Sequence, residues 1–180
     1  MSKIKLKIIS TIIAFLLCFP LHFLYEKYPN FITSIFAPVN ESIWEHMKIL
    51  FSSILFTGIL QKIYAKITDI KYNNVCISNF ISAILSIPIF LIVFFPIYNI
   101  IGENMTITII IMLITIVASE IISYNIMNKP EHKLEKDTVI FAIITYIIFT
   151  ILTYYPPNNN IFVDPKTNTY GINRHIKNSN

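Results

Sequence analysis

The sequence predicts an all-α protein, a polytopic transmembrane bundle of about five helical spans with a short polar C-terminal tail. Its 180 residues are 54% hydrophobic and only 13% charged, whereas soluble domains carry about 25% charged residues. Residues 72–102 and 138–163 contain no Asp, Glu, Lys or Arg. Because roughly 20 apolar residues in a helix cross a bilayer core, these stretches predict an integral membrane protein whose main partner is the lipid bilayer.

Five apolar segments are long enough to span a membrane and together form one bundle domain over residues 1–157. They are 6–25, 47–66, 76–98, 105–126 and 138–155. The first resembles a secretion signal, but no small-residue cleavage site follows it, so we expect it to remain as a span. The second is the weakest, because Lys48 and Lys62 leave only residues 49–61 between them. An amphipathic helix on the membrane surface is the alternative there, and it would leave four spans.

Residues 158–180 form a polar, turn-rich tail. Pro156 and Pro157 end the last span, because proline cannot continue a helix. The segment 164–168, Asp-Pro-Lys-Thr-Asn, predicts a turn with proline at its second position. We expect the residues after Gly171 to be disordered.

The placement of the basic residues predicts an orientation. With the N-terminus in the cytoplasm, the inner segments hold Lys3, Lys5, Lys7, Lys62, Lys66, Lys71, Lys129, Lys133 and Lys136. The short outer segments hold only Lys27 and Lys48. The positive-inside rule then predicts a multi-pass protein of the cytoplasmic membrane, with the tail outside. No basic stripe with interleaved aromatic residues is present, so we expect no nucleic-acid partner.

Small polar residues recur every four positions on two of the spans. One stripe is Ser78, Ser82 and Ser86, and the other is Thr115, Ser119 and Ser123. Small residues let helices approach closely in a membrane, so we expect the stripes to face each other, another helix or a second copy of the chain. The alternative is that these hydroxyls bond carbonyls of their own helix.

A polar block at the outer start of the second span is the main candidate for a function. Its residues of interest are Asn40, Glu41, Trp44, Glu45, His46 and Lys48. In one interpretation the block is a helix start, in which Ser42 and Glu45 form a capping box and Trp44 lies at the membrane interface.

In the other interpretation the block is a functional site. Glu41, Glu45 and His46 would then point into an outer cavity, where His22 and Glu26 from the first span could join them. Carboxylates and imidazoles serve metal binding and general acid–base chemistry. The spacing matches no metal signature, so we expect no metal and no cofactor, and whether the protein is an enzyme stays open.

Glu120 lies inside the fourth predicted span. A carboxylate within a membrane is costly and commonly serves proton or ion movement. The alternative is a protonated side chain that bonds a neighbouring helix.

The polar block, residues 37–48 (Ala-Pro-Val-Asn-Glu-Ser-Ile-Trp-Glu-His-Met-Lys), and the tail motif 164–171 (Asp-Pro-x-Thr-x-x-Tyr-Gly) together resemble a family of small bacterial integral membrane proteins. This is the domain of unknown function numbered sixty-five-twelve. One departure is Asn168, where the family pattern has glycine; asparagine tolerates the same left-handed conformation. The resemblance covers nearly the whole chain and implies a membrane protein without assigned catalytic residues.

Three functions are consistent with these observations. The first is a structural or interaction component that self-associates, because the sequence contains no cofactor motif, nucleophile constellation or phosphate loop. The second is a membrane-embedded enzyme or metal-dependent site that uses His22, Glu41, Glu45 and His46. The third is a small ion or solute carrier that uses Glu120.

Overall fold

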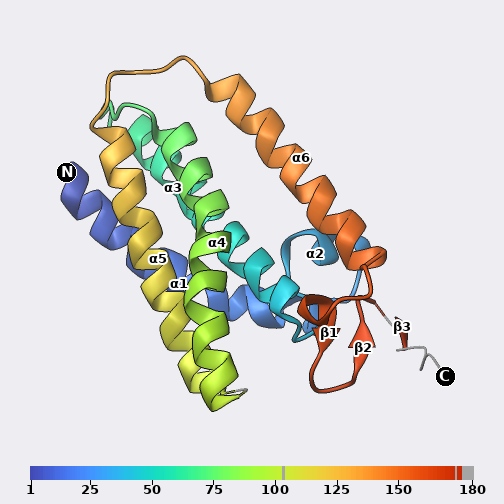
Figure 1. The fold of residues 1–180 in the computed structure, drawn as a ribbon. Coiled ribbons are helices and arrows are strands. Elements are labelled where there is room, and N and C mark those ends of the chain that lie inside the picture. Colours follow the sequence, from blue (N-terminus) through green and yellow to red (C-terminus); the bar gives the residue numbers. More distant parts are fainter. Residues whose placement is uncertain (103, 173, 176–180) are drawn as a thin grey trace.

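The protein is a bundle of long helices closed at one end by a small tail. The structure is a computed structural model that describes residues 1–102, 104–172 and 174–175. Five helices are long and apolar enough to cross a membrane: α1 (Lys3–Lys27), α3 (Ile43–Ile67), α4 (Val75–Ile101), α5 (Met105–Met127) and α6 (Glu135–Tyr154) (Figure 1). The prediction of a bundle of about five spans is confirmed.

Helix α3 is the central element of the bundle. In the most apolar 18-residue stretch of α3, 61% is buried inside the protein, whereas the corresponding share is 17% in α6 and 22% in α1. Its buried residues include Leu50, Phe51 and Ile54 in the main core, and α1 and α4 pack against it. The alternative in which this segment lies on the membrane surface is therefore wrong. It is also the least hydropathic of the five helices, because its polar side chains face protein and not lipid.

A short helix that the sequence analysis did not predict, α2 (Phe31–Phe36), connects α1 to α3. It begins with a complete capping box, in which the side chain of Asn30 accepts from the Thr33 N–H and the Thr33 hydroxyl accepts from the Asn30 N–H. Capping of this kind satisfies backbone N–H groups that a helix start leaves unpaired. α2 also packs against α6, where Ser34 and Tyr154 share a hydrogen bond of 3.1 Å.

The two stripes of small polar residues lie where α4 and α5 pack together. All six residues are buried, and the Ser82 hydroxyl donates to the carbonyl of Ser119 at 2.7 Å. Ser78 and Ser86 donate to carbonyls of their own helix. The stripes thus combine close helix packing with local hydrogen bonds inside a single chain. Self-association stays a prediction, and these buried stripes offer no surface for it.

The tail folds back on the end of the bundle that also holds α2 (Figure 1); we call this the tail end, and the opposite end the N-terminal end. It comprises η1 (Asn160–Phe162) and an antiparallel sheet of β1 (Val163–Asp164), β2 (Thr169–Tyr170) and β3 (Arg174–His175). The predicted turn is present, since Asp164 Oδ1 accepts from the Lys166 N–H at 2.9 Å. Asn168 has φ 53°, the left-handed conformation that glycine or asparagine adopts there.

The predicted disordered end concerns mainly residue 173 and residues 176–180, which lie outside the described residues. Of the others, Arg174 and His175 pair with β2.

Trp44 packs between the tail and the bundle, because the centroid of its ring lies 5.1 Å from that of Phe149 in α6 and 5.0 Å from that of Phe162 in η1.

Candidate functional site

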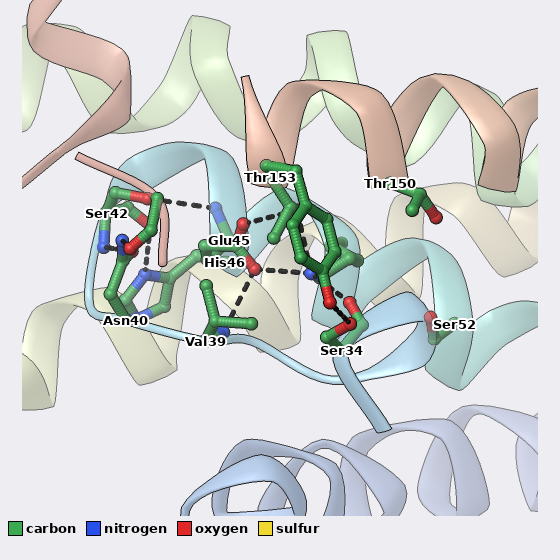
Figure 2. A network of polar contacts seen from close by, with 12 residues as sticks. Ser34, Val39, Asn40, Ser42, Glu45, His46, Ser52, Thr150 and Thr153 are labelled. Carbon is green, nitrogen blue, oxygen red and sulfur yellow. Dashed lines mark hydrogen bonds and ion pairs between the residues drawn. The ribbon is translucent and has the colours of Figure 1, made fainter. Parts of the chain in front are cut away.

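Glu45 and Lys48 form a buried ion pair at the tail end; Figure 2 shows the surroundings of Glu45, with Val39 and Thr153 beside it. Lys48 Nζ lies 2.6 Å from Glu45 Oε2 and donates to the carbonyl of Ser34 in α2 and to Thr153 Oγ1 in α6. The Glu45 carboxylate also accepts from the Thr153 hydroxyl at 2.8 Å and from the Val39 N–H at 3.1 Å. The pair therefore holds α2, α3 and α6 together, and every oxygen and hydrogen it buries has a partner.

The start of α3 is capped without the predicted capping box. Ser42 Oγ accepts from the Glu45 N–H at 3.4 Å, as expected for an N-cap residue. The Glu45 carboxylate, however, turns toward Lys48, and the N–H of Ser42 donates to Asn40 Oδ1 at 2.9 Å instead. Asn40 also donates to the carbonyl of Gly171 at 3.1 Å, which ties the tail to the polar block. Asn40, Glu45 and Lys48 thus make their polar contacts with other segments of the protein.

A cavity of about 770 Å³ lies beside this network, between α1, the start of α3, α4, α5 and the tail. Its walls are largely apolar and rich in aromatic residues, among them Phe15, Phe19, Phe23, Phe90, Phe94 and Phe95. Small-molecule sites have volumes of about 300–1,000 Å³ and combine apolar walls with a few polar groups. The cavity has the size and character of such a site.

Two histidines, one glutamate and one lysine lie close together in the lining of the cavity: His22, Glu41, His46 and Lys166. Lys166 Nζ donates to Glu41 Oε1 at 3.0 Å. His22 Nε2 lies 3.5 Å from Glu41 Oε1, and His46 Nε2 lies 3.8 Å from Glu41 Oε2. We call this group the head cluster. The two imidazole–carboxylate distances exceed those of good hydrogen bonds, so Glu41 is bonded mainly to Lys166.

The ring of His46 is oriented by its own helix start. His46 Nδ1 lies 2.9 Å from the carbonyl oxygen of Ser42. Because a carbonyl only accepts, Nδ1 carries the proton, and Nε2 is the nitrogen turned toward Glu41 and the cavity. The imidazole rings of His22 and His46 are 6.0 Å apart between centroids. Two imidazole nitrogens and one carboxylate therefore face the same space.

The remaining residues predicted at this site lie elsewhere. Glu26 is exposed near the end of α1 and is not among the residues that line the cavity. Trp44 packs between α6 and the tail, and its buried Nε1 has no hydrogen-bond partner among the described residues. Within the described part of the chain, no three His, Cys, Asp or Glu side chains are arranged to hold a metal ion.

A second polar centre is buried at the N-terminal end, where Glu120 meets Lys7 of α1. Lys7 Nζ lies 3.1 Å from Glu120 Oε2, but its three N–H bonds go to Gln61 Oε1, Asn79 Oδ1 and Ser123 Oγ at 3.1, 3.1 and 2.6 Å. Neither oxygen of the Glu120 carboxylate has a hydrogen-bond partner within the described residues. The ion pair with Lys7 is therefore the main polar contact of the Glu120 carboxylate among the described residues.

Sequence reasoning missed several residues of these two sites. Lys7 and Lys166 were interpreted only as topology signals or tail charges, although Lys7 begins a predicted span. Gln61 and Asn79 carried a signal that could have found them, because each is a polar amide inside a predicted apolar span. Such residues face protein and bond across helices.

The fold and the cavity define a multi-pass membrane protein with a partly open cavity of about 770 Å³ at its tail end. Residues 1–172 match a protein family described as a family of unknown function (DUF6512), and the chain belongs to that family. No match was found among curated proteins or among solved structures.

Proposed function

We propose that this protein binds an amphiphilic molecule of the membrane in its tail-end cavity. The observation that carries the proposal is the cavity itself, whose aromatic and aliphatic walls lead to the head cluster at one side. An apolar chain would lie against Phe19, Phe90 and Phe94, while its polar head would reach His22, Glu41 and His46. Nearby apolar helices make the bilayer the natural source of such a ligand.

The asymmetry of basic residues supports an orientation for this site. Lys62, Lys66 and Lys71 flank the connection at the N-terminal end, as the positive-inside rule requires of a cytoplasmic loop. The tail end then faces outward from the cytoplasmic membrane, and the head of the amphiphile binds at the outer leaflet. Addition of a membrane-impermeant cysteine reagent to cells that carry an Asn158→Cys variant tests this, because only an outward tail is labelled.

A photoreactive probe tests the binding proposal. Purified protein in lipid nanodiscs is illuminated with a diazirine derivative of hexadecanol, and the labelled peptides are identified by mass spectrometry. We expect label on the cavity walls of α1 and α4. Ile109 lines the cavity from α5, whereas its neighbour Ile110 is exposed on the surface of the same helix. Ile109→Trp fills the cavity and should abolish the wall label, and Ile110→Trp should leave it unchanged.

The same experiment separates binding from a purely structural or interaction role. A structural component needs no occupant, so label spread evenly over lipid-facing residues, and unaffected by Ile109→Trp, would favour that role and reject the proposal.

A second candidate is ion or proton movement through Glu120. Its support is the buried ion pair of Glu120 with Lys7 inside the bundle, because ionisable residues within membrane spans commonly mark proton and ion pathways. Proteoliposomes with a pH gradient and an entrapped pH dye test it. Flux that survives Glu120→Gln would reject this candidate.

A further inference from the structure

We infer that the buried polar centre at the N-terminal end is a binding site for a large monovalent cation, K⁺ or ammonium, in which the side-chain ammonium of Lys7 takes the place of the free ion. The site lies at the opposite end of the bundle from the tail-end cavity, so it does not depend on amphiphile binding. It also goes beyond ion movement, because a cation can bind there whether or not ions cross the membrane.

Four side-chain oxygens lie around the nitrogen of the Lys7 ammonium. The distances from Nζ are 3.1 Å to Gln61 Oε1, 3.1 Å to Asn79 Oδ1, 2.6 Å to Ser123 Oγ and 3.1 Å to Glu120 Oε2. Carboxylate and amide oxygens are typical ligands of hard cations, and the hydroxyl adds a further acceptor. We call these four residues, all of them buried, the oxygen cage.

The oxygen cage comes from helices other than the one that carries the lysine. Gln61 belongs to α3, Asn79 to α4, and Glu120 and Ser123 to α5. Helix α4 packs against both α3 and α5, and the first turns of α1 lie beside α5 (Figure 1). The oxygens therefore stay together when the lysine side chain withdraws, as a binding site for a free ion requires.

Hydrogen bonds outside the cage orient both of its amide groups. Asn79 Nδ2 donates to the carbonyl of Val75 at 2.7 Å and to Gln61 Oε1 at 3.1 Å. Gln61 Nε2 donates to Ser10 Oγ at 2.6 Å. The N–H groups of both amides are thus engaged elsewhere, which leaves their oxygens for the positive charge. A site held in its binding geometry in this way loses less free energy to ordering when a ligand binds.

Charge and distance indicate the class of cation. Glu120 is the single acidic member of the cage, so the cage balances one positive charge and suits a monovalent ion. Three of the four distances to the central atom are 3.1 Å, whereas oxygens bind Ca²⁺ at about 2.3–2.6 Å and Mg²⁺ at about 2.0–2.1 Å. K⁺ and ammonium are monovalent cations of the larger size that these distances require.

A free cation has a short path to the cage. Lys3, one helical turn before Lys7, is half-buried and donates to the carbonyl of Met127 and to Asn128 Oδ1, where α5 ends. The lysine side chain is a flexible four-carbon stem, so the ammonium of Lys7 can turn toward this end of the bundle. Exchange of the ammonium for a free cation gives Glu120 a positive partner throughout, which avoids the high cost of an unpaired buried charge.

Amine labelling of the parent protein tests this exchange. Protein in lipid nanodiscs is treated with acetic anhydride in KCl or in choline chloride at equal ionic strength, and acetylation of each lysine is followed by mass spectrometry. We expect Lys7 to react several times faster in KCl, because K⁺ in the cage leaves the amine outside it. Lys5, an exposed lysine of the same helix, is the matched control and should react equally in both salts. Equal rates for Lys7 would overturn the exchange.

Removal of the tethered ammonium tests the site itself. In Lys7→Ala, each tenfold increase of K⁺ above its dissociation constant should raise the melting temperature in detergent by about 3–5 °C. Choline chloride, whose cation is too large for the cage, should have no such effect. Glu120→Gln in the same background should remove the response. Lys3→Ala is the matched control and should melt alike in the two salts.

Parallel titrations with KCl, NH₄Cl and NaCl identify the ion. The salt that stabilises Lys7→Ala at the lowest concentration names it, and a response to NaCl as strong as that to the other two would overturn the assignment to a large cation. Absence of a K⁺ response, or a response that survives Glu120→Gln, would overturn the site. If Lys7→Ala does not fold, the labelling of the parent protein decides.

These outcomes are separate from those for the proposed function. Amphiphile binding is measured by photolabelling of the cavity walls at the other end of the bundle, so failure of the cation site leaves it standing. Cation binding without flux in proteoliposomes would reject ion movement through Glu120 and leave the present inference intact.

Discussion

The two buried ion pairs differ in how completely they are bonded. Glu45 and Lys48 lie three residues apart on α3, and hydrogen bonds from α2, α6 and the 37–42 connection satisfy both side chains. Lys7 and Glu120 come from α1 and α5, and the lysine gives its hydrogen bonds to neutral oxygens of other residues. Both members of the first pair form several hydrogen bonds to neighbouring segments, whereas the carboxylate of the second pair has Lys7 as its main polar contact among the described residues.

The difference indicates different roles for the two pairs: Glu45 and Lys48 connect helices, whereas Glu120 is a candidate for proton or ion binding. A buried pair that is fully bonded stabilises the fold only as long as both partners are present, because either one alone is an unpaired buried charge. A carboxylate with unused acceptor oxygens can take a proton or a cation without the loss of an existing hydrogen bond. The polar block divides in the same way. Glu45 contacts Lys48 and Thr153, whereas Glu41 and His46 line the cavity.

Removal of Lys48 should have the largest effect on stability. Lys48→Met leaves the Glu45 carboxylate unpaired in a fully buried position, which should lower the free energy of unfolding by about 3–5 kcal/mol. Thermal unfolding in detergent, followed by tryptophan fluorescence, measures it. Lys27→Met, at an exposed position, should change little.

A double variant sharpens this result. Glu45→Gln added to Lys48→Met removes the stranded charge and should recover part of the lost stability. A double variant that is less stable than Lys48→Met would show that the carboxylate is not the cause.

Gly58 should also be a sensitive position, because α3 and α4 approach closely there. A Cβ added to Gly58 would lie 2.6 Å from the Cβ of Asn79, a partner of Lys7. Gly58→Ala should therefore cost about 1–3 kcal/mol through overpacking. The same change in an Asn79→Gly background should cost much less, and the coupling between the two sites is measured by a double-mutant cycle of thermal unfolding. Equal costs in both backgrounds would contradict the close contact.

Much of the fold could be predicted from the sequence, because each span is a local property of composition. The charge-free stretches correspond to α4 and α6, and the turn at 164–168 follows from its proline and asparagine. Helix α2 could not be predicted, since its six residues depend on the capping by Asn30 and on packing against α6.

The candidate site was predictable only in part, for a related reason. Glu45 and Lys48 share one helix face, so their pairing is a matter of spacing. The contact of Lys7 with Glu120 and that of Lys166 with Glu41 join residues more than a hundred positions apart. Such contacts depend on how the helices cross, which residue pattern does not specify. His22 and Glu41 were predicted to meet, because both belong to the same end of neighbouring spans.

Neutralisation of Glu120 should cost less than neutralisation of Glu45. Glu120→Gln leaves the buried Lys7 ammonium without its carboxylate, but Lys7 keeps its three neutral acceptors, so we expect a loss of about 1–2 kcal/mol. Glu45→Gln disturbs bonds from Val39, Lys48 and Thr153 and should cost about 2–3 kcal/mol. Parallel melting curves of the two variants compare the pairs directly, and equal losses would remove the distinction between them.

The smallest effect should come from Asn40, which joins the polar block to the tail. Asn40→Ala removes the bond to the Gly171 carbonyl and the cap on the Ser42 N–H, at a cost of about 1 kcal/mol. Gly171 cannot be changed for the same purpose, because its φ of 52° and the nearby Thr153 carbonyl exclude a side chain. The tail of Asn40→Ala should be cleaved faster by limited proteolysis while the helices melt almost as in the parent. A tail that is cleaved no faster than in the parent would contradict this role of the Asn40 bonds.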